Sequence, residues 1–214
     1  MGWQAFRISM EVTAVATVLV VIVGTAAGLL LARVRFPGIQ LVEALFMLPL
    51  VLPPSVVGYY LLRFLGTGGP VEGLFGVNLV LTWGAAVLAS AVVALPLMVQ
   101  AARTAIRGVD PVLENAARTL GSSEAAVFFR VTLPLARRML IAGAVLSAAR
   151  ALGEFGATLM VAGNIPGRTQ TLPLFVYDAV YNHQYGTVNL VVGLLTGLGL
   201  VSFIVIGRLD PAHR

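Results

Sequence analysis

Five apolar segments, each long enough to cross a lipid bilayer as a helix, constrain the fold of this chain more than any other feature. They cover about residues 12–33, 43–65, 77–102, 138–163 and 187–208. A helix of about 20 residues spans the roughly 30 Å of hydrocarbon in a bilayer. The segments lack the alternation of barrel strands, and a helix satisfies its own backbone groups. The sequence therefore predicts an all-α polytopic membrane protein with a single transmembrane domain over residues 1–214.

The composition supports a lipid environment. Hydrophobic residues make up 58% and charged residues 11% of the chain, against about 45–50% and about 25% in soluble domains. All 14 basic residues are arginine; membrane topology itself requires arginine-rich loops, so this charge does not indicate nucleic-acid binding. The chain has no cysteine, and His183 and His213 lack partners at metal-ligand spacing. We therefore expect neither a disulfide framework nor a metal site.

The distribution of arginine predicts the orientation. Ten arginines would share one face of the membrane, among them Arg208 and Arg214, whereas the other face would hold Arg7, Arg63 and Arg168. Loops rich in arginine stay in the cytoplasm. Five spans then place the N-terminus outside, and the C-terminus and residues 103–137 inside.

Residues 103–137 form a polar interruption between two apolar segments, which we call the hook. Asp110 can cap a first short helix, and Pro111 suits its first position. Gly121 would end that helix, and Ser122 or Ser123 would cap a second one that must stop near Leu133, because Pro134 disfavours helix at the residue before it. A pair of short helices on one membrane face is typical of a docking surface for a soluble partner.

Two other interpretations of the hook remain open on these observations. An amphipathic loop lying on lipid headgroups would also be rich in basic residues. A DNA-binding helix-turn-helix has a similar turn, but a hook wedged between two spans has little reach, so we expect no nucleic-acid partner.

The hook resembles the EAA loop of ABC importer permeases, whose pattern is E-A-A, three residues, G, nine residues, I, any residue, L-P. The chain reads Ala116-Ala117-Arg-Thr-Leu-Gly121, then nine residues, then Val131-Thr-Leu-Pro134. Asn115 stands where the family has Glu, and Val131 replaces Ile. In the family this loop inserts a coupling helix into a groove of a cytoplasmic ATPase. The resemblance implies these coupling residues: Glu114, Asn115, Ala116, Ala117, Gly121, Phe128, Phe129, Leu133 and Pro134.

The resemblance also implies the partners. An ABC importer permease of this kind works in the prokaryotic inner membrane as a homodimer embedded in lipid, with two ATPase subunits and an external substrate-binding protein. A P-loop requires a lysine to reach the nucleotide phosphates, and the chain has none. We therefore expect no enzyme activity and no cofactor in this chain, with ATP and Mg²⁺ bound by the partner subunit.

Two segments are candidates for the transport path or its gate. Charges inside a span usually face protein or water, and Arg150 and Glu154 are spaced to share a helix face. Gly153 and Gly156 in the same helix permit close approach. Prolines that remove backbone donors interrupt the second segment. The candidate residues are Pro49, Pro53, Pro54, Arg150, Gly153, Glu154, Phe155 and Gly156. A packing role is the alternative for both segments, as it is the default for the G-x-x-x-G pairs Gly24/Gly28 and Gly193/Gly197.

The stretch from Gly153-Glu-Phe-Gly156 to Asn164-Ile-Pro-Gly167-Arg-Thr169-Gln-Thr171-Leu-Pro173 resembles the oxyanion branch of the importer family. Its second half is most similar to molybdate permeases, with tungstate and sulfate or thiosulfate permeases as alternatives. The outer loop would then receive the binding protein, although an aromatic belt at the membrane interface is an alternative for its tyrosines. The candidate docking residues are Asn164, Pro166, Gly167, Arg168 and Tyr177.

Two further classes compete with an ATP-driven importer. In a stand-alone secondary carrier, Arg150 and Glu154 would bind a coupling ion. An intramembrane enzyme would need a nucleophile or a His-Asp constellation near the spans, and the sequence shows neither.

Overall fold

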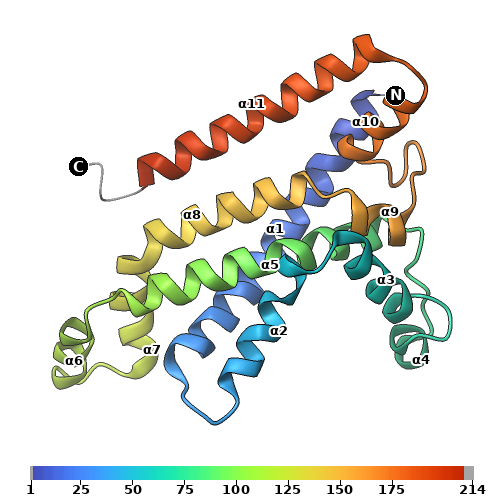
Figure 1. Cartoon of the computed structure of the whole chain (residues 1–214). Coiled ribbons are helices and arrows are strands. Elements are labelled where there is room, and N and C mark those ends of the chain that lie inside the picture. Colours follow the sequence, from blue (N-terminus) through green and yellow to red (C-terminus); the bar gives the residue numbers. More distant parts are fainter. Residues whose placement is uncertain (1, 210–214) are drawn as a thin grey trace.

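The computed structural model describes residues 2–209, and every regular element in that range is a helix (Figure 1). The long helices are α1 (Gly2–Arg33), α5 (Trp83–Arg107), α8 (Leu133–Leu152) and α11 (Tyr185–Leu209). Each is apolar and long enough to cross a bilayer, α8 together with the helical turns that precede it. The all-α prediction is confirmed. His213 and Arg214 lie outside the described residues.

The second predicted span is a bent pair of helices. The helix α2 (Ile39–Val51) meets the segment Pro54–Phe75, made of α3 (Pro54–Leu65) and α4 (Pro70–Phe75), at 114°. Pro53 separates the two helices and Pro54 starts α3, as proline's missing donor predicts, whereas Pro49 lies inside α2 without ending it. The described residues thus hold four candidate spans, or five if the bent pair is one span.

The core lies where α1, α5 and α8 pack side by side (Figure 1). Small residues allow this close packing, because α5 buries a series of alanines and α1 presents Gly24 and Gly28 to it. A Cβ at Gly24 would lie 2.8 Å from the Met98 side chain. The packing role of this glycine pair is therefore confirmed. Around Gly193 and Gly197, by contrast, nothing in the described chain lies within 4 Å of an added Cβ.

The fourth predicted helix, over residues 138–163, is broken. The helix α8 ends at Leu152, Gly153 caps it, and a separate short helix α9 (Gly156–Ala162) follows. Arg150 and Glu154 therefore do not share one helix face, and that prediction is wrong. A glycine inside a helix destabilises it by about 1 kcal/mol relative to alanine. The break between α8 and α9 therefore falls where Gly153 and Gly156 flank the charged Glu154.

Other helix boundaries also differ from the predicted ones. The helix α1 begins at Gly2, well before residue 12, and α5 begins at Trp83 because the Thr82 hydroxyl caps it by accepting from the Ala85 N–H at 3.2 Å. After α9, a loop leads to α10 (Leu172–Tyr181), which packs against the N-terminal part of α1 and against α11. Where these helices enter and leave the bilayer, and the single domain over residues 1–214, stay predictions.

Candidate functional site: the polar hook between α5 and α8

The hook lies at one end of the long helices, beside the C-terminal ends of α1 and α5 (Figure 1). The Arg107 guanidinium donates to the Leu31 carbonyl of α1 at 3.1 Å, which ties these two ends together. The arginine-rich ends predicted to share one face are thus neighbours. The side of the membrane on which they lie stays a prediction.

The local chemistry of the hook follows the sequence closely. The Asp110 carboxylate caps α6 (Pro111–Thr119) by accepting from the Val112 N–H at 2.9 Å. Gly121 takes φ = 83°, a left-handed conformation that glycine adopts at little cost. The Ser123 hydroxyl then caps α7 (Glu124–Val127) by accepting from the Ala126 N–H at 3.3 Å.

The second hook helix does not stop near Leu133, contrary to the prediction. The chain continues from α7 through a π-helical turn η1 (Phe128–Thr132) directly into α8. In that wider turn the Leu133 N–H donates to the Phe128 carbonyl, five residues back. Pro134 then occupies the first turn of α8, where its missing donor is tolerated. As a result, the hook is mechanically continuous with the long helix α8.

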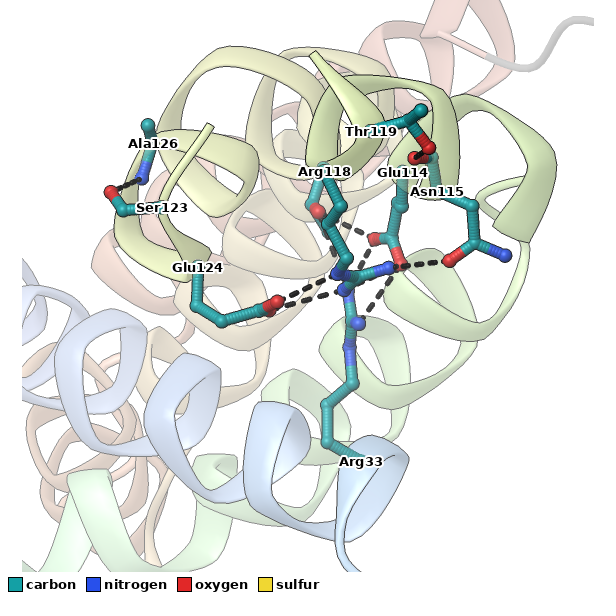
Figure 2. Close-up of polar contacts among 9 residues, drawn as sticks. Arg33, Glu114, Asn115, Arg118, Thr119, Ser123, Glu124 and Ala126 are labelled. Carbon is teal, nitrogen blue, oxygen red and sulfur yellow. Dashed lines mark hydrogen bonds and ion pairs between the residues drawn. The ribbon is translucent and has the colours of Figure 1, made fainter. Parts of the chain in front are cut away.

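A buried carboxylate holds the hook to the ends of two long helices (Figure 2). Glu114 is 5% exposed. Its Oε2 accepts from Arg33 Nη1 at 2.9 Å, and its Oε1 accepts from Arg33 Nη2 and, at 2.6 Å, from the Thr132 hydroxyl. Arg33 ends α1 and Thr132 precedes α8, so one carboxylate joins three elements. We call Arg33, Glu114 and Thr132 the clasp.

Arg118 extends this network across the hook. Its Nε donates to Glu124 Oε1 at 2.6 Å, its Nη1 donates to Asn115 Oδ1 at 2.9 Å, and its Nη2 lies 3.8 Å from Glu114 Oε2 (Figure 2). Two arginines and two glutamates therefore neutralise one another. Such a network fixes the angle between α6 and α7.

The titration of the two glutamates reflects these contacts. Burial raises the pKa of Glu114, but hydrogen bonds from Arg33 and Thr132 and the charges of Arg33 and Arg118 outweigh it and leave the pKa below its ordinary value of 4.5. The hydrogen bond from Arg118 lowers the pKa of Glu124 as well. Both carboxylates are thus charged at neutral pH.

The outward surface of the hook carries part of the predicted coupling set. Asn115, Ala116 and Phe129 are exposed. Leu120, which is not in the predicted set, lies at the turn between α6 and α7 and is 87% exposed. Phe128 and Leu133 are half-buried and, together with Phe129, line an apolar groove of about 670 Å³ beside α1. The predicted coupling set therefore includes exposed residues, residues that line the groove, and the buried Glu114.

The two candidate path segments meet in the structure. A Cβ at Gly156 would lie 2.9 Å from Pro54 Cβ, so α9 packs against the start of α3. Arg150 Nη1 donates to Glu154 Oε2 at 2.9 Å, and the other carboxylate oxygen of Glu154 accepts from the Ala157 N–H at 2.8 Å. Glu154 thus pairs with the end of α8 and caps the start of α9.

The predicted docking residues lie at the end of the long helices opposite the hook. Pro166, Gly167 and Arg168 are exposed in the loop between α9 and α10, and Asn164 is half-buried. Tyr177 packs on Phe155, with ring centroids 5.3 Å apart. One predicted docking residue therefore contacts one predicted gate residue.

Sequence reasoning missed Arg33 and Thr132 as site residues. In the sequence, Arg33 contributes only to the number of arginines on one membrane face, and Thr132 occupies the variable position of the loop pattern. Their partner is Glu114, 81 and 18 residues away respectively. Within residues 2–209, no group of three His, Cys, Asp or Glu side chains is arranged to hold a metal ion.

Comparisons with known proteins agree with this architecture. Residues 10–214 match the family described as binding-protein-dependent transport system inner membrane component. The molybdenum transport system permease protein ModB of Escherichia coli K12 is 47% identical over 182 residues, covering 83% of this chain and 80% of that protein. The sulfate transport system permease protein CysW of Synechococcus elongatus is 33% identical, covering 97% and 73%. Both are named as permease proteins rather than enzymes.

The fold has a match among solved structures. The MetNI methionine ABC transporter, in inward-facing conformations, superposes with a TM-score of 0.71 at 18% identity, covering 98% of this chain and 94% of that one. At this identity the likeness concerns the fold alone, which is that of an ABC importer permease.

Proposed function

The chain belongs to the family of binding-protein-dependent transport system inner membrane components, and we propose that it is the permease subunit of an ATP-driven importer of molybdate. The observation that supports the mechanism best is the hook, two capped helices braced by Glu114 with an apolar surface turned outward. Alternating access in such a subunit moves the anion from an external binding protein to the cytoplasm.

Two ATPase subunits supply the energy by binding the outward surface of the hook. Leu120 and Ala116 offer this partner an apolar and a small side chain, while the clasp keeps the surface in a fixed orientation. Because the chain has no lysine for a P-loop, ATP and Mg²⁺ bind in the partner. Closure of the ATPase pair then rocks the helices, as in other domain rearrangements.

The permease works as a homodimer in the inner membrane of a prokaryote. The exposed apolar surface of α11 and of the outer side of α1 suits lipid or a second copy. A path for an anion is enclosed more readily by a symmetric pair than by four or five helices. The hook faces the cytoplasm, the N-terminus lies outside, and the binding protein docks on the loop between α9 and α10.

The ATPase contact is tested by replacing Leu120 with glutamate. A charge at the centre of an apolar interface should abolish co-purification of the ATPase subunit. Leu74→Glu is the matched control, because Leu74 is 78% exposed but lies on α4, away from the hook. Co-purification that survives Leu120→Glu, or that both variants lose equally, would refute the docking surface.

The cargo is tested by uptake into vesicles that contain the complete transporter. Molybdate uptake should require ATP and the binding protein, and sulfate at equal concentration should not compete. Competition by sulfate would instead favour the alternative set by the sulfate relative. Uptake that continues on a proton gradient without ATP would indicate a secondary carrier.

A further inference from the structure

The clasp does more than shape the hook, because it fastens the hook to a helix that extends to the opposite end of the molecule. We propose that α1 is the mechanical link between the ATPase-docking hook and the binding-protein loop, with Arg33 and Ser9 as its two attachment residues. This inference rests on the proposed function and assigns to α1 a role in transmitting force between the two sites.

The attachment at Arg33 is short-ranged and directional. Both guanidinium Nη atoms of Arg33 donate to the two oxygens of Glu114, and Nη2 also donates to Thr132 Oγ1 at 3.3 Å. A two-point contact of this kind resists rotation as well as separation. Glu114 is buried, so water does not compete for the carboxylate. Displacement of α6 is therefore passed to the last turn of α1.

The body of α1 can carry that displacement. Its 32 residues form one uninterrupted helix, which at 1.5 Å per residue is about 48 Å long. Buried residues recur every four positions from Val12 to Gly28, with Ala27 and Leu31 also buried near the end, and Gly24 and Gly28 lie against α5. A helix supported in this way slides or tilts as a unit rather than bending.

The opposite end of α1 is attached to α10. The Ser9 hydroxyl, 2% exposed, accepts a hydrogen bond from the Leu172 N–H at 2.7 Å, at the first residue of α10. Ala5 packs with Phe175 in an apolar cluster beside it. A Cβ at Gly167 would lie 3.8 Å from the Gln4 side-chain oxygen, so α1 also touches the loop predicted to meet the binding protein.

Because the chain has no cysteine, introduced cysteines can be used to remove the contact between Arg33 and Glu114 and to replace it with a cross-link. In the complete transporter, the double variant Arg33→Cys with Glu114→Cys removes the clasp, and a short thiol-reactive cross-linker reconnects it. We expect the ATPase stimulation caused by loaded binding protein to fall at least tenfold in the double variant, measured on complexes isolated with both ATPase subunits attached. Cross-linking should restore at least half of the stimulation, and neither single-cysteine variant should respond to the reagent.

The opposite attachment is tested with Ser9→Ala, which should reduce the same stimulation at least threefold without lowering basal hydrolysis. Ser202→Ala is the matched control, since the Ser202 hydroxyl donates only within its own helix, to Leu198 O at 2.9 Å. If the cysteine variants do not fold, Glu114→Gln is used in their place to weaken the clasp. Full stimulation without the clasp, or no recovery on cross-linking, would overturn the link. Failure of the ATPase to bind the unaltered permease would instead refute the proposed function.

Discussion

Replacement of Gly28 by valine should drive α1 away from α5. A Cβ at this position would lie 2.5 Å from Ala102 Cβ and 2.9 Å from both the Arg103 N and the Val99 O. Carbon atoms pack best at about 3.5–4.0 Å, so the helices must separate by roughly 1 Å. Two of the three contacted atoms are backbone, which leaves no side chain that could turn aside.

The cost follows from the packing of the core. Overfilling a well-packed interior costs about 1–3 kcal/mol, which changes an equilibrium constant by roughly 5- to 150-fold. For a chain of this size, each kcal/mol corresponds to about 2–4 °C in the unfolding midpoint. Gly28→Val should therefore lower the midpoint by roughly 2–12 °C.

The assay is heating of the detergent-solubilised permease followed by size-exclusion chromatography of the folded fraction. Gly197→Val is the matched control, since it places the same side chain in the other G-x-x-x-G pair, where nothing in the described residues lies within 4 Å. Equal midpoints for the two variants, or an unchanged midpoint for Gly28→Val, would refute the argument that contact with α5 requires glycine.

Three further substitutions or conditions test the site. Gly121→Val forces a β-branched residue to φ = 83°, which strains the backbone by about 1–3 kcal/mol. ATP hydrolysis should then continue while transport stops. Normal coupling of hydrolysis to transport would show that the turn is unimportant. The pKa of Glu114 is lowered from 4.5, so the charged carboxylate stabilises the hook fully above pH 4.5, and this stabilisation is lost as the pH falls below that value. Proteolytic cleavage of the hook should therefore rise only below about pH 4.5. A rise between pH 6 and 7 would contradict the assignment. Glu154→Arg should open an ATP-independent anion leak in vesicles, because it opposes Arg150 and removes the cap on α9; a leak of the same size in Glu154→Gln would show that the charge is irrelevant.

The parts of the hook that depend on near neighbours could be predicted from the sequence. Asp110 and Ser123 cap helices that begin within three residues of them, and Gly121 adopts the left-handed turn between the helices. Each of these choices is decided by local backbone chemistry. The predicted apolar segments and the all-α fold succeeded for a related reason, since backbone groups in lipid must be satisfied within their own segment.

Predictions that needed a tertiary partner or a competing local geometry did not succeed. Pro134 indicated a stop, but the chain continues from α7 through the π-helical turn into α8, with Pro134 in the first turn of α8. The spacing of Arg150 and Glu154 fits an uninterrupted helix as well as an ion pair across a break, and the packing of Gly156 against Pro54 is a tertiary contact that the spacing does not reveal. Arg33 could not be assigned to Glu114 because 81 residues separate them.

The pairing of charges in the described residues bears on how a permease can pass a dianion without trapping it. Arg103 pairs with Glu43, and Arg150 pairs with Glu154, which also accepts from the backbone at the start of α9. An unpaired arginine on a transport path would hold an oxyanion by charge-assisted hydrogen bonds. If the candidate residues Arg150 and Glu154 line the proposed path, this neutralised pair would hold the anion weakly, and discrimination between molybdate and sulfate would fall to the proposed binding protein. Glu154→Gln, which leaves Arg150 without a charged partner, should therefore slow release of the anion during ATP-driven uptake into vesicles.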